Sequence, residues 1–306
     1  GLALALVGCG GGAAVHDAGP DGPPPEPSGC IGDVRAGDHV YTCETLRVDA
    51  RVPAACVTGG CGLILELHGD TGNGLLMDGH TQLRALGDQY GYIVVAPTGP
   101  PFGQGQPGGT WHAAQDASLV AIVQRFASVF HVDAKRIHVT GFSRGGFVTW
   151  RLLCDHSDLF ASIAPGGAGD GTAFGEMTCF TPGRAPATRR PILFLAGKTD
   201  ASVSYASMTK IRDAAIASYG GATAQPLDGD ADYAHARWGT GGALIETFEH
   251  WYETVTPGPF AYARGHCIPG SQSDPQAPQY AIPCKLPNAF TWGEQVMAFF
   301  RAHPQP

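Results

Sequence analysis

Short apolar runs alternate with amphipathic segments through the middle of the chain. The runs at 63–67, 92–96, 137–140 and 191–196 are almost continuously apolar, as expected for strands of a parallel sheet covered on both faces. Residues 117–130 carry apolar side chains at three- and four-residue spacing, and shorter helical patterns lie at 146–154 and 205–219. This alternation predicts an α/β fold with a mostly parallel sheet, right-handed crossovers and helices on both faces.

Length and composition fit one large folded domain. The chain has 306 residues, of which 43% are hydrophobic and 15% charged, a balance that excludes a largely disordered protein. Residues 10–29 are instead rich in glycine and proline and predict a flexible tether, which leaves 30–306 as a single domain. The formal net charge is -8 and no basic run occurs, so we expect no nucleic-acid partner. We also expect a monomer.

The first nine residues indicate export. Residues 1–8 are small and apolar and precede Cys9, so segment 1–9 resembles the end of a secretory leader. The stretch Leu6-Val7-Gly8-Cys9 is also similar to the lipobox of bacterial lipoproteins, whose cysteine is lipid-modified; a plain leader remnant is the alternative. No apolar run reaches the roughly 20 residues of a membrane-spanning helix. We therefore expect an extracytoplasmic protein, either secreted or held at the membrane only by a lipid on Cys9.

Nine cysteines support the same location. If Cys9 carries lipid, the remaining eight could form four disulfides, which would be unusual in a reducing cytosol. Close spacing suggests two local pairs, and two more would complete the set, although spacing leaves other connectivities open. The suggested pairs are Cys30–Cys43, Cys56–Cys61, Cys154–Cys179 and Cys267–Cys284. We expect no metal site, because no C-x-x-C pair occurs and no histidine has ligand spacing to two cysteines.

The clearest chemical motif is Gly141-Phe142-Ser143-Arg144-Gly145. It is a G-x-S-x-G sequence between a predicted strand and a predicted helix, the context in which this motif forms the nucleophile elbow of α/β-hydrolases. A tight turn would expose the Ser143 hydroxyl at a helix N-terminus, and the glycines would let strand and helix approach. An ordinary glycine-rich turn is the alternative. The motif and the order of elements predict an α/β-hydrolase fold stabilised by disulfides.

A nucleophilic serine needs a base and an acid that orients the base, and in this fold the acid and then the histidine follow the serine. Asp200 follows the 191–196 strand, and a turn or helix-cap role is its alternative. The other acids considered are Asp228, Asp230 and Asp232. The later histidines are His235, His250, His266 and His303. We predict His266 as the base because it lies in a loop, rich in glycine and proline, that can fold back over the elbow.

Two backbone N–H groups should bind the oxyanion that forms during acyl transfer. One is that of Arg144, directly after the nucleophile. The other is that of Asp70, or alternatively Thr71, in the loop after the 63–67 strand. The Asp70 carboxylate must then point away from the developing negative charge. We expect His68 to be a buried residue that organises this loop.

The runs VDAKRIHVTGFSRGG at 132–146 and DLFASIAP at 158–165 resemble the polyhydroxybutyrate depolymerase-like esterases, a group that includes feruloyl and acetylxylan esterases. The resemblance extends from Cys43 to Pro269 and is strongest between residues 133 and 165. It implies a triad of Ser143, Asp200 and His266, and it places the LHG turn of the family at 67–69. Residues 220–262 fit the family poorly, so we expect a lid or substrate wall there that is particular to this chain.

Three residues are predicted to bind substrate. Trp111 offers flat apolar area for an acyl or aromatic group, with a packed loop anchor as its alternative role. Thr71 lies in the oxyanion loop. Ile268 follows the predicted base at a position where family members often carry tryptophan, so the resemblance does not imply an aromatic subsite here.

Together these features predict a serine carboxylic-ester hydrolase that needs no cofactor. The resemblance implies small-molecule or polymeric esters as substrates, such as polyhydroxyalkanoate, feruloyl or acetyl esters of the plant cell wall, or aromatic polyester. One alternative is a non-catalytic surface binding protein on the same scaffold, in which His266 or Asp200 would be misplaced. A second is a serine peptidase of the prolyl-oligopeptidase type, which is disfavoured because no propeller-like β domain is predicted.

Overall fold

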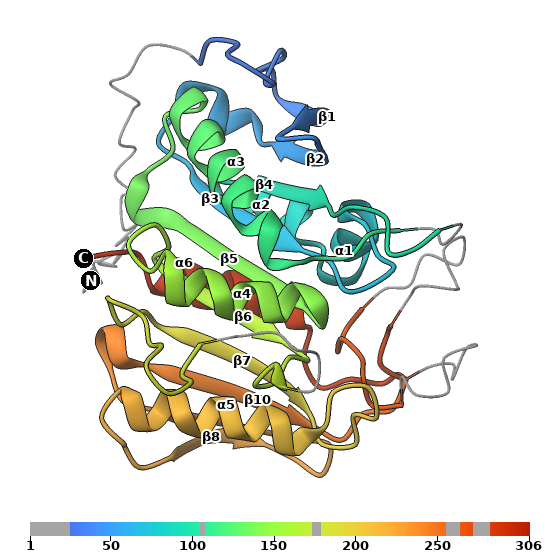
Figure 1. The fold of residues 1–306 in the computed structure, drawn as a ribbon, viewed down its shortest axis with the longest axis vertical. Helices are drawn as coiled ribbons and strands as arrows, with labels where there is room; N and C mark the ends of the chain where they lie inside the picture. The colour runs from blue at the N-terminus through green and yellow to red at the C-terminus, as the bar shows by residue number, and fades with distance from the viewer. Residues whose placement is uncertain (1–24, 105–107, 173–178, 255–263, 272–281) are drawn as a thin grey trace, which may run out of the picture.

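Ten strands form one sheet in this computed structural model, in the order β1-β2-β4-β3-β5-β6-β7-β10-β9-β8 (Figure 1). The structure describes residues 25–104, 108–172, 179–254, 264–271 and 282–306. Segment 1–9 with Cys9, and residues 10–24 of the expected tether, lie outside the described residues. The predicted α/β architecture with a mostly parallel sheet is confirmed.

Parallel strands make up the centre of the sheet. They are β3 (Gly62–Leu67), β4 (Tyr92–Thr98), β5 (Ile137–Phe142), β6 (Ser162–Gly166), β7 (Ile192–Gly197) and β10 (Ile245–His250). Antiparallel strands extend one edge as β1 (Gly37–Cys43) and β2 (Leu46–Val52), and the other as β9 (Tyr233–Trp238) and β8 (Gln225–Gly229). The four strands predicted from apolar runs are β3, β4, β5 and β7. Because parallel strands share a direction, the loops that follow β3, β5, β6 and β7 meet at one end of the sheet, beyond the carboxyl ends of these strands.

Part of the segment expected to form a lid or substrate wall extends the sheet. Residues 225–250 contain β8, β9 and β10, and β10 pairs in parallel with β7 over its whole length. Residues 255–262 of the segment lie outside the described residues. The expectation is therefore wrong for 225–250, because the backbone of this part completes the hydrogen bonding of β7 instead of standing above the sheet.

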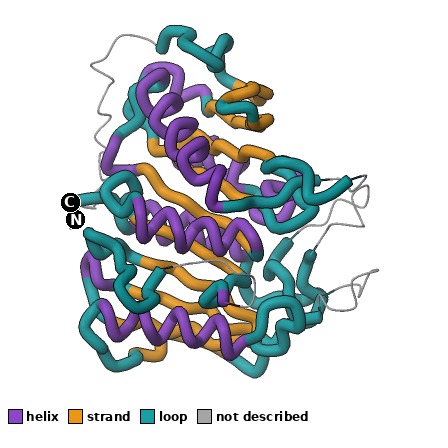
Figure 2. Tube along the Cα trace, viewed as in Figure 1, coloured by secondary structure: helices purple, strands orange, loops and turns teal. Residues whose placement is uncertain are grey.

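Helices cover both faces of the sheet. They are α1 (Gly74–Thr81), α2 (Leu83–Tyr90), α3 (Asp116–Val129), α4 (Arg144–Asp155), α5 (Tyr205–Ser218) and α6 (Trp292–Ala302). Figures 1 and 2 show α4 in front of the strands and α6 behind them; α3 contacts α4, and α1 and α2 contact α6. Short 3-10 turns lie at Ala54–Thr58, Ala113–Gln115, Ala134–Arg136 and Gly241–Ala243. Among the described helices, none has the length and apolar character needed to cross a bilayer.

The two faces of the sheet have separate cores. On β3, Leu63 and Leu65 are buried with Phe126 of α3 in one apolar cluster. Ile64, between them in sequence, is buried in the other cluster with Phe300 of α6. Successive side chains of a strand point to opposite faces, so a strand that is covered on both faces must be apolar at every position. This is why the apolar runs predict the central strands and not the edge strands.

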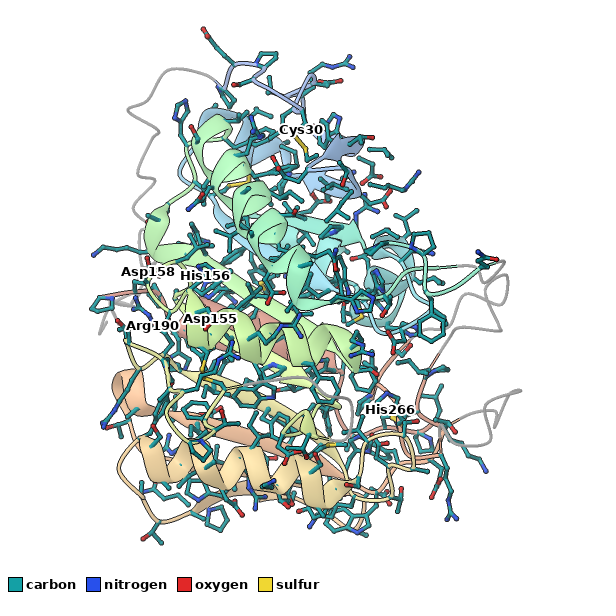
Figure 3. The ribbon with its side chains drawn as sticks, in the orientation of Figure 1. Cys30, Asp155, His156, Asp158, Arg190 and His266 are labelled. Carbon is teal, nitrogen blue, oxygen red and sulfur yellow. A yellow bond between two sulfur atoms is a disulfide. The ribbon has the colours of Figure 1, made fainter. Side chains whose placement is uncertain are left out.

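Four disulfides join the cysteines in the pairs that sequence spacing suggests, so this prediction is confirmed. They are Cys30–Cys43, Cys56–Cys61, Cys154–Cys179 and Cys267–Cys284. The first lies at the β1 edge of the sheet, where Figure 3 labels Cys30. The last lies in the loop that carries His266. Disulfides are typical of proteins that fold outside a reducing cytosol.

Candidate active site

Ser143 occupies a strained turn between β5 and α4. Its backbone angles are φ 54° and ψ -120°, in the left-handed half of conformational space that non-glycine residues rarely adopt. The Ser143 N–H donates to the carbonyl oxygen of Gly166 at 2.9 Å, which ties the turn to the end of β6. Ser143 is half-buried and directly precedes α4. The N-terminal end of a helix favours negative charge. The predicted strand, turn and helix are all present.

Two glycines allow this turn to form. A Cβ at Gly141 would lie 2.5 Å from the carbonyl oxygen of Gly145, so any side chain there would collide with the first turn of α4. A Cβ at Gly145 would lie 2.1 Å from the carbonyl oxygen of Leu67, at the end of β3. These glycines therefore let β5, α4 and β3 approach at the point where Ser143 is presented.

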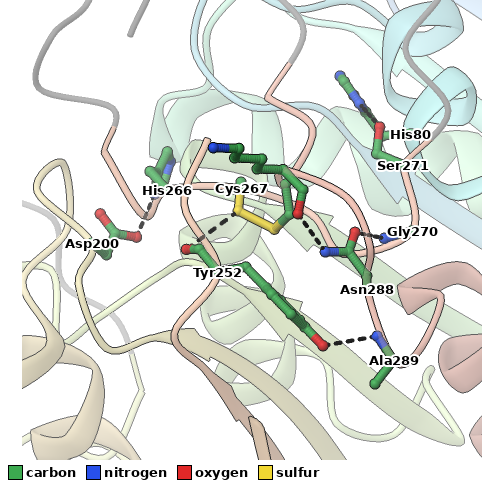
Figure 4. Close-up of a disulfide and its surroundings, with 11 residues drawn as sticks. His80, Asp200, Tyr252, His266, Cys267, Gly270, Ser271, Asn288 and Ala289 are labelled. Carbon is green, nitrogen blue, oxygen red and sulfur yellow. Dashed lines mark hydrogen bonds and ion pairs between the residues drawn. A yellow bond between two sulfur atoms is a disulfide. The ribbon is translucent and has the colours of Figure 1, made fainter. Parts of the chain in front are cut away.

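Asp200 and His266 form a buried pair beyond the carboxyl ends of the central strands, where Ser143 also lies. Asp200 lies in the turn after β7, and its Oδ2 is 2.6 Å from Nδ1 of His266 (Figure 4). Its Oδ1 accepts the N–H groups of Ser202 and Val203, each at 2.8 Å. Both carboxylate oxygens are thus engaged, and the carboxylate orientation is fixed. With Nδ1–H donated to Asp200, Nε2 is the nitrogen of a neutral imidazole that can accept a proton.

The imidazole of His266 lies against the elbow. Its ring centroid is 4.7 Å from that of Phe142, the residue before Ser143. Its Cε1 is 3.1 Å from the position that a Cβ on Gly167 would take, and the neighbouring Gly166 binds the Ser143 amide. No hydrogen bond joins Ser143 Oγ to the ring within the described residues, and catalytic hydrogen bonds of this kind often tighten only when substrate binds. Figure 3 places His266 near the start of α4, whereas Asp155 and His156 lie at its other end.

The other histidines considered as the base have different environments. His250 on β10 is 1% exposed, and burial lowers its pKa to about 4. His235 on β9 lies 3.1 Å from Asp228 and stacks on Phe248. His303 follows α6 and, with Glu246, lines a groove at the amino ends of β7 and β10, away from the loops that carry Ser143. Of these histidines, His266 is the one that is hydrogen-bonded to Asp200 among the described residues.

The other acids are also engaged elsewhere. The Asp228 carboxylate faces His235, and the Asp230 carboxylate accepts the N–H groups of Asp232 and Tyr233 in a tight turn. This turn lies between β8 and β9, at the far edge of the sheet from β5. Asp200 is therefore the acid of the predicted set that the fold brings to the histidine.

His68 organises the loop after β3, as the sequence predicts. It is 1% exposed, its Nδ1 lies 2.6 Å from the carbonyl oxygen of Gly69, and its Nε2 accepts the Gly99 N–H at 3.0 Å. Burial lowers the pKa of His68 to about 4, so the ring is neutral at pH 7 and its tautomer is set by these two contacts. The histidine thus links the loops after β3 and β4 and is not positioned as a base.

The loop after β3 runs beside the elbow. A Cβ on Gly69 would lie 3.2 Å from Ser143 Cβ. The Thr71 N–H donates to the carbonyl oxygen of Gly109 at 2.8 Å and is therefore engaged, whereas the Asp70 N–H makes no hydrogen bond within the described residues. The Arg144 N–H belongs to the first turn of α4, ahead of the first intrahelical bond from Phe147 to Ser143. The geometry favours the Asp70 amide over that of Thr71.

The side chains of these two oxyanion candidates are paired, which sequence reasoning did not anticipate. Arg144 Nε lies 3.2 Å from Asp70 Oδ1. The hydroxyl of Thr110 donates to the same carboxylate oxygen at 2.5 Å. The expectation that the Asp70 carboxylate is held away from the oxyanion thus has a physical basis. The opposite charges of Asp70 and Arg144 were the available sequence signal.

Two residues predicted to bind substrate are buried instead. Trp111 is 0% exposed, and its indole N–H donates to the carbonyl oxygen of His68 at 2.9 Å, so its alternative role as a loop anchor fits. Ile268 is 0% exposed and packs in the same apolar cluster as Trp292. Neither lines a surface open to substrate, because distant segments cover both. Thr71 is half-buried, and its hydroxyl donates to the carbonyl oxygen of Asp70 at 2.6 Å.

One cluster of possible metal ligands occurs among the described residues. The ligand atoms of His250, Cys267 and Cys284 lie within 4.8 Å of one another. Both sulfurs belong to one disulfide, drawn in Figure 4, so they offer no thiolate to a metal. The Cys267–Cys284 disulfide instead links the loop that carries His266 covalently to the segment before α6.

The chain has relatives among curated proteins and solved structures. No family model matches the chain. Over 132 residues it is 33% identical to feruloyl esterase B of Neurospora crassa, covering 41% of this chain and 43% of that protein. Over 127 residues it is 31% identical to a poly(3-hydroxyoctanoate) depolymerase of Pseudomonas fluorescens, covering 39% of this chain and 45% of that protein. The chain thus spans less than half the length of these curated relatives.

Among solved structures, an acetyl xylan esterase from Aspergillus awamori matches with a TM-score of 0.54 at 18% identity, covering 70% of this chain and 93% of that chain. At this identity the match shows the fold. The resemblance inferred from the sequence is confirmed by the names of the relatives. The chain is therefore an α/β-hydrolase by fold, and its sequence relatives are carboxylic-ester hydrolases named feruloyl esterase, acetylxylan esterase and poly(3-hydroxyalkanoate) depolymerase.

Proposed function

We propose that this chain is a serine carboxylic-ester hydrolase in which Ser143, His266 and Asp200 act together. The observation that carries the proposal is that all three residues lie at the same end of the sheet, beyond the carboxyl ends of its parallel strands. The strained turn presents Ser143 at the start of α4, and the imidazole bound to Asp200 packs on Phe142, the residue before the serine. A hydroxyl, a base and an orienting acid in this arrangement are what acyl transfer requires.

In the proposed reaction, Ser143 Oγ attacks the carbonyl carbon of the ester while its proton passes to His266 Nε2. Asp200 holds the Nδ1–H and stabilises the imidazolium that forms. The backbone N–H groups of Arg144 and Asp70 donate to the carbonyl oxygen as it becomes anionic. The imidazolium then protonates the departing alcohol, and water deprotonated by His266 cleaves the acyl-enzyme to release the acid.

Mutation of the serine tests the proposal. Wild-type protein should hydrolyse p-nitrophenyl butyrate and become labelled by a fluorophosphonate probe, and Ser143→Ala should lose both. Ser218→Ala, at the exposed end of α5, is the matched control and should keep both. Labelling and hydrolysis by Ser143→Ala at the wild-type level would refute the assignment. Wild-type protein without labelling would favour the non-catalytic binding protein, and cleavage of peptide anilides in place of esters would favour the peptidase.

Polymer-derived or plant-cell-wall esters are the proposed substrates. The support is that the matched relatives are named for feruloyl, acetylxylan and polyhydroxyalkanoate esters. Rates on methyl ferulate, acetylated xylan and polyhydroxybutyrate film would rank these classes. Equal, low rates on all three, with fast hydrolysis of a soluble short-chain ester, would contradict a polymer-related role.

An extracytoplasmic location, with lipid attached at Cys9, is also proposed. Four disulfides support export, and the residues around Cys9, which lie outside the described residues, support lipid attachment. Expressed in a bacterium with a complete leader, the wild type should fractionate with membranes and Cys9→Ser should not. Wild-type protein in the soluble fraction would count against the lipid anchor.

A further inference from the structure

The loop after β3 meets the elbow through glycines. Gly69 lies against the Ser143 side chain, and Gly145 lies against the carbonyl oxygen of Leu67, so at each point one of the two segments contributes no side chain. Interdigitating side chains normally fix the separation of packed elements. These contacts limit how closely the loop and the start of α4 approach, but they include no interdigitated pair of side chains that holds the two segments together.

The side chains directly beside these glycines supply such an interaction. Arg144 Nε lies 3.2 Å from Asp70 Oδ1 and 3.4 Å from Oδ2. These residues are 74 positions apart, so the contact joins two elements that the chain itself does not connect. The Arg144 side chain is 15% exposed and that of Asp70 34%, which screens the pair less than a fully exposed one.

Asp70 is also fixed from the opposite side. The hydroxyl of Thr110 donates to its Oδ1 at 2.5 Å. Backbone hydrogen bonds from Thr71 to Gly109 and from Gly109 to Gly72, each 2.8 Å, join the loops after β3 and β4. The Asp70 carboxylate is therefore held between a cross-linked loop pair and the first residue of α4.

We propose that the side chains of Asp70, Arg144 and Thr110 form a clamp that sets the spacing of the two oxyanion-binding amides, an inference that rests on the proposed esterase function. The side chains are positioning groups, and the amides of Asp70 and Arg144 are the groups that touch the reacting oxygen. An oxyanion hole stabilises the transition state fully only when both donors lie at hydrogen-bonding distance from that oxygen, and loss of one donor lowers kcat by about 100- to 1000-fold. Release of the clamp lets one amide drift, and a displacement of about 1 Å lowers the rate about 100-fold.

Two substitutions test the clamp. Asp70→Asn keeps the shape of the side chain and removes its charge, and Thr110→Val removes the hydroxyl contact while leaving the ion pair. Each should lower kcat on p-nitrophenyl butyrate by about 10- to 100-fold and leave KM unchanged. Inhibition by a trifluoromethyl ketone, which forms a tetrahedral oxyanion on the serine, should weaken by the same factor. A merely structural role would not make ketone affinity follow kcat.

Asp88→Asn is the matched control, because Arg51 Nε lies 3.0 Å from both carboxylate oxygens of Asp88 in an exposed pair between β2 and α2. It should leave kcat and ketone affinity unchanged. Active wild type with unchanged kcat and ketone affinity in Asp70→Asn and Thr110→Val would overturn the clamp alone. Wild type that neither cleaves the ester nor reacts with fluorophosphonate would overturn the proposed function and the clamp with it. If Asp70→Asn does not fold, Thr110→Val decides the outcome.

Discussion

Replacement of Gly145 by alanine should destabilise the protein, although Gly145 lies in a helix. Alanine in a helix is ordinarily favoured over glycine by about 1 kcal/mol. At this position, however, the new Cβ would lie 2.1 Å from the carbonyl oxygen of Leu67 and 2.8 Å from that of His68. Both contacts are with backbone atoms that cannot rotate away, so α4 must move off β3.

The magnitude follows from that displacement. Overpacking a close contact typically costs about 1–3 kcal/mol, and this clash is severe enough to exceed the helix-propensity gain. We expect the free energy of unfolding to fall by about 2 kcal/mol and Tm by about 5 °C. Arg144 and Asp70 lie on the two segments that separate, so kcat should fall about 100-fold.

Gly79→Ala provides the opposite outcome for the same chemical change. Gly79 lies in α1, is exposed, and has nothing within 4 Å of the position that a Cβ would take. This variant should gain up to about 1 kcal/mol and keep full activity. Thermal unfolding followed by circular dichroism, with p-nitrophenyl butyrate kinetics, measures both variants. A Gly145→Ala protein that melts at or above the wild-type temperature would refute the close-approach argument.

Three further predictions concern the acid, the disulfides and pH. In Asp200→Asn, the side-chain oxygen should still accept the N–H groups of Ser202 and Val203, but the amide favours the wrong tautomer of His266. Steady-state assays should show kcat lowered by about 10⁴-fold. A loss under tenfold would contradict the role of Asp200. Removing the Cys267–Cys284 disulfide, whose cysteines are 17 positions apart, should lower the free energy of unfolding by about 3 kcal/mol and reduce activity. Removing the Cys56–Cys61 disulfide should leave kcat unchanged. Chemical denaturation measures the stability of both variants, and steady-state kinetics measures their activity. Burial lowers the pKa values of four histidines from 6.5, to about 4 for His68, His80 and His250 and about 3 for His138. The unfolded chain therefore binds more protons than the folded one below about pH 6.5, so the contribution of these histidines to stability is full above that pH and declines toward pH 4. The four histidines outnumber the two carboxyls with raised pKa values, Glu66 and Asp78, which act in the opposite direction. A free energy of unfolding that stays constant from pH 7 to 5 would contradict the argument.

The parts of the site that were predictable from sequence depend on short stretches of chain. The elbow needs glycines two residues either side of Ser143, and this spacing is visible without any tertiary contact. Asp200 was recognisable because it follows an apolar strand. His266 had rivals of the same residue type, and only its loop context favoured it. Its contact with Asp200, across 66 residues, is visible only in the fold.

Burial is where sequence reasoning failed. Trp111 and Ile268 have the composition of a substrate wall, yet both are covered by other segments. Three strands, β8, β9 and β10, lie within 220–262, where a lid was expected. The sequence did not reveal β9, because this strand is half-exposed and lacks the continuous apolar run that marks a strand buried on both faces. A residue's own neighbours in sequence do not reveal which distant segment packs on it.

The sequence by itself determined four of the central strands, β3, β4, β5 and β7, and the serine turn, because local patterning dictates them. Cysteine spacing suggested the four disulfide pairs, and the structure selected them from the connectivities that spacing left open. Only the tertiary structure decided which histidine meets Asp200, which aromatic side chains are buried, and that Asp70 pairs with Arg144. The physical reason is that hydrophobic periodicity specifies which face of an element is buried but does not specify which other element packs on that face. The partner is chosen when the sheet assembles and brings the carboxyl ends of its strands together.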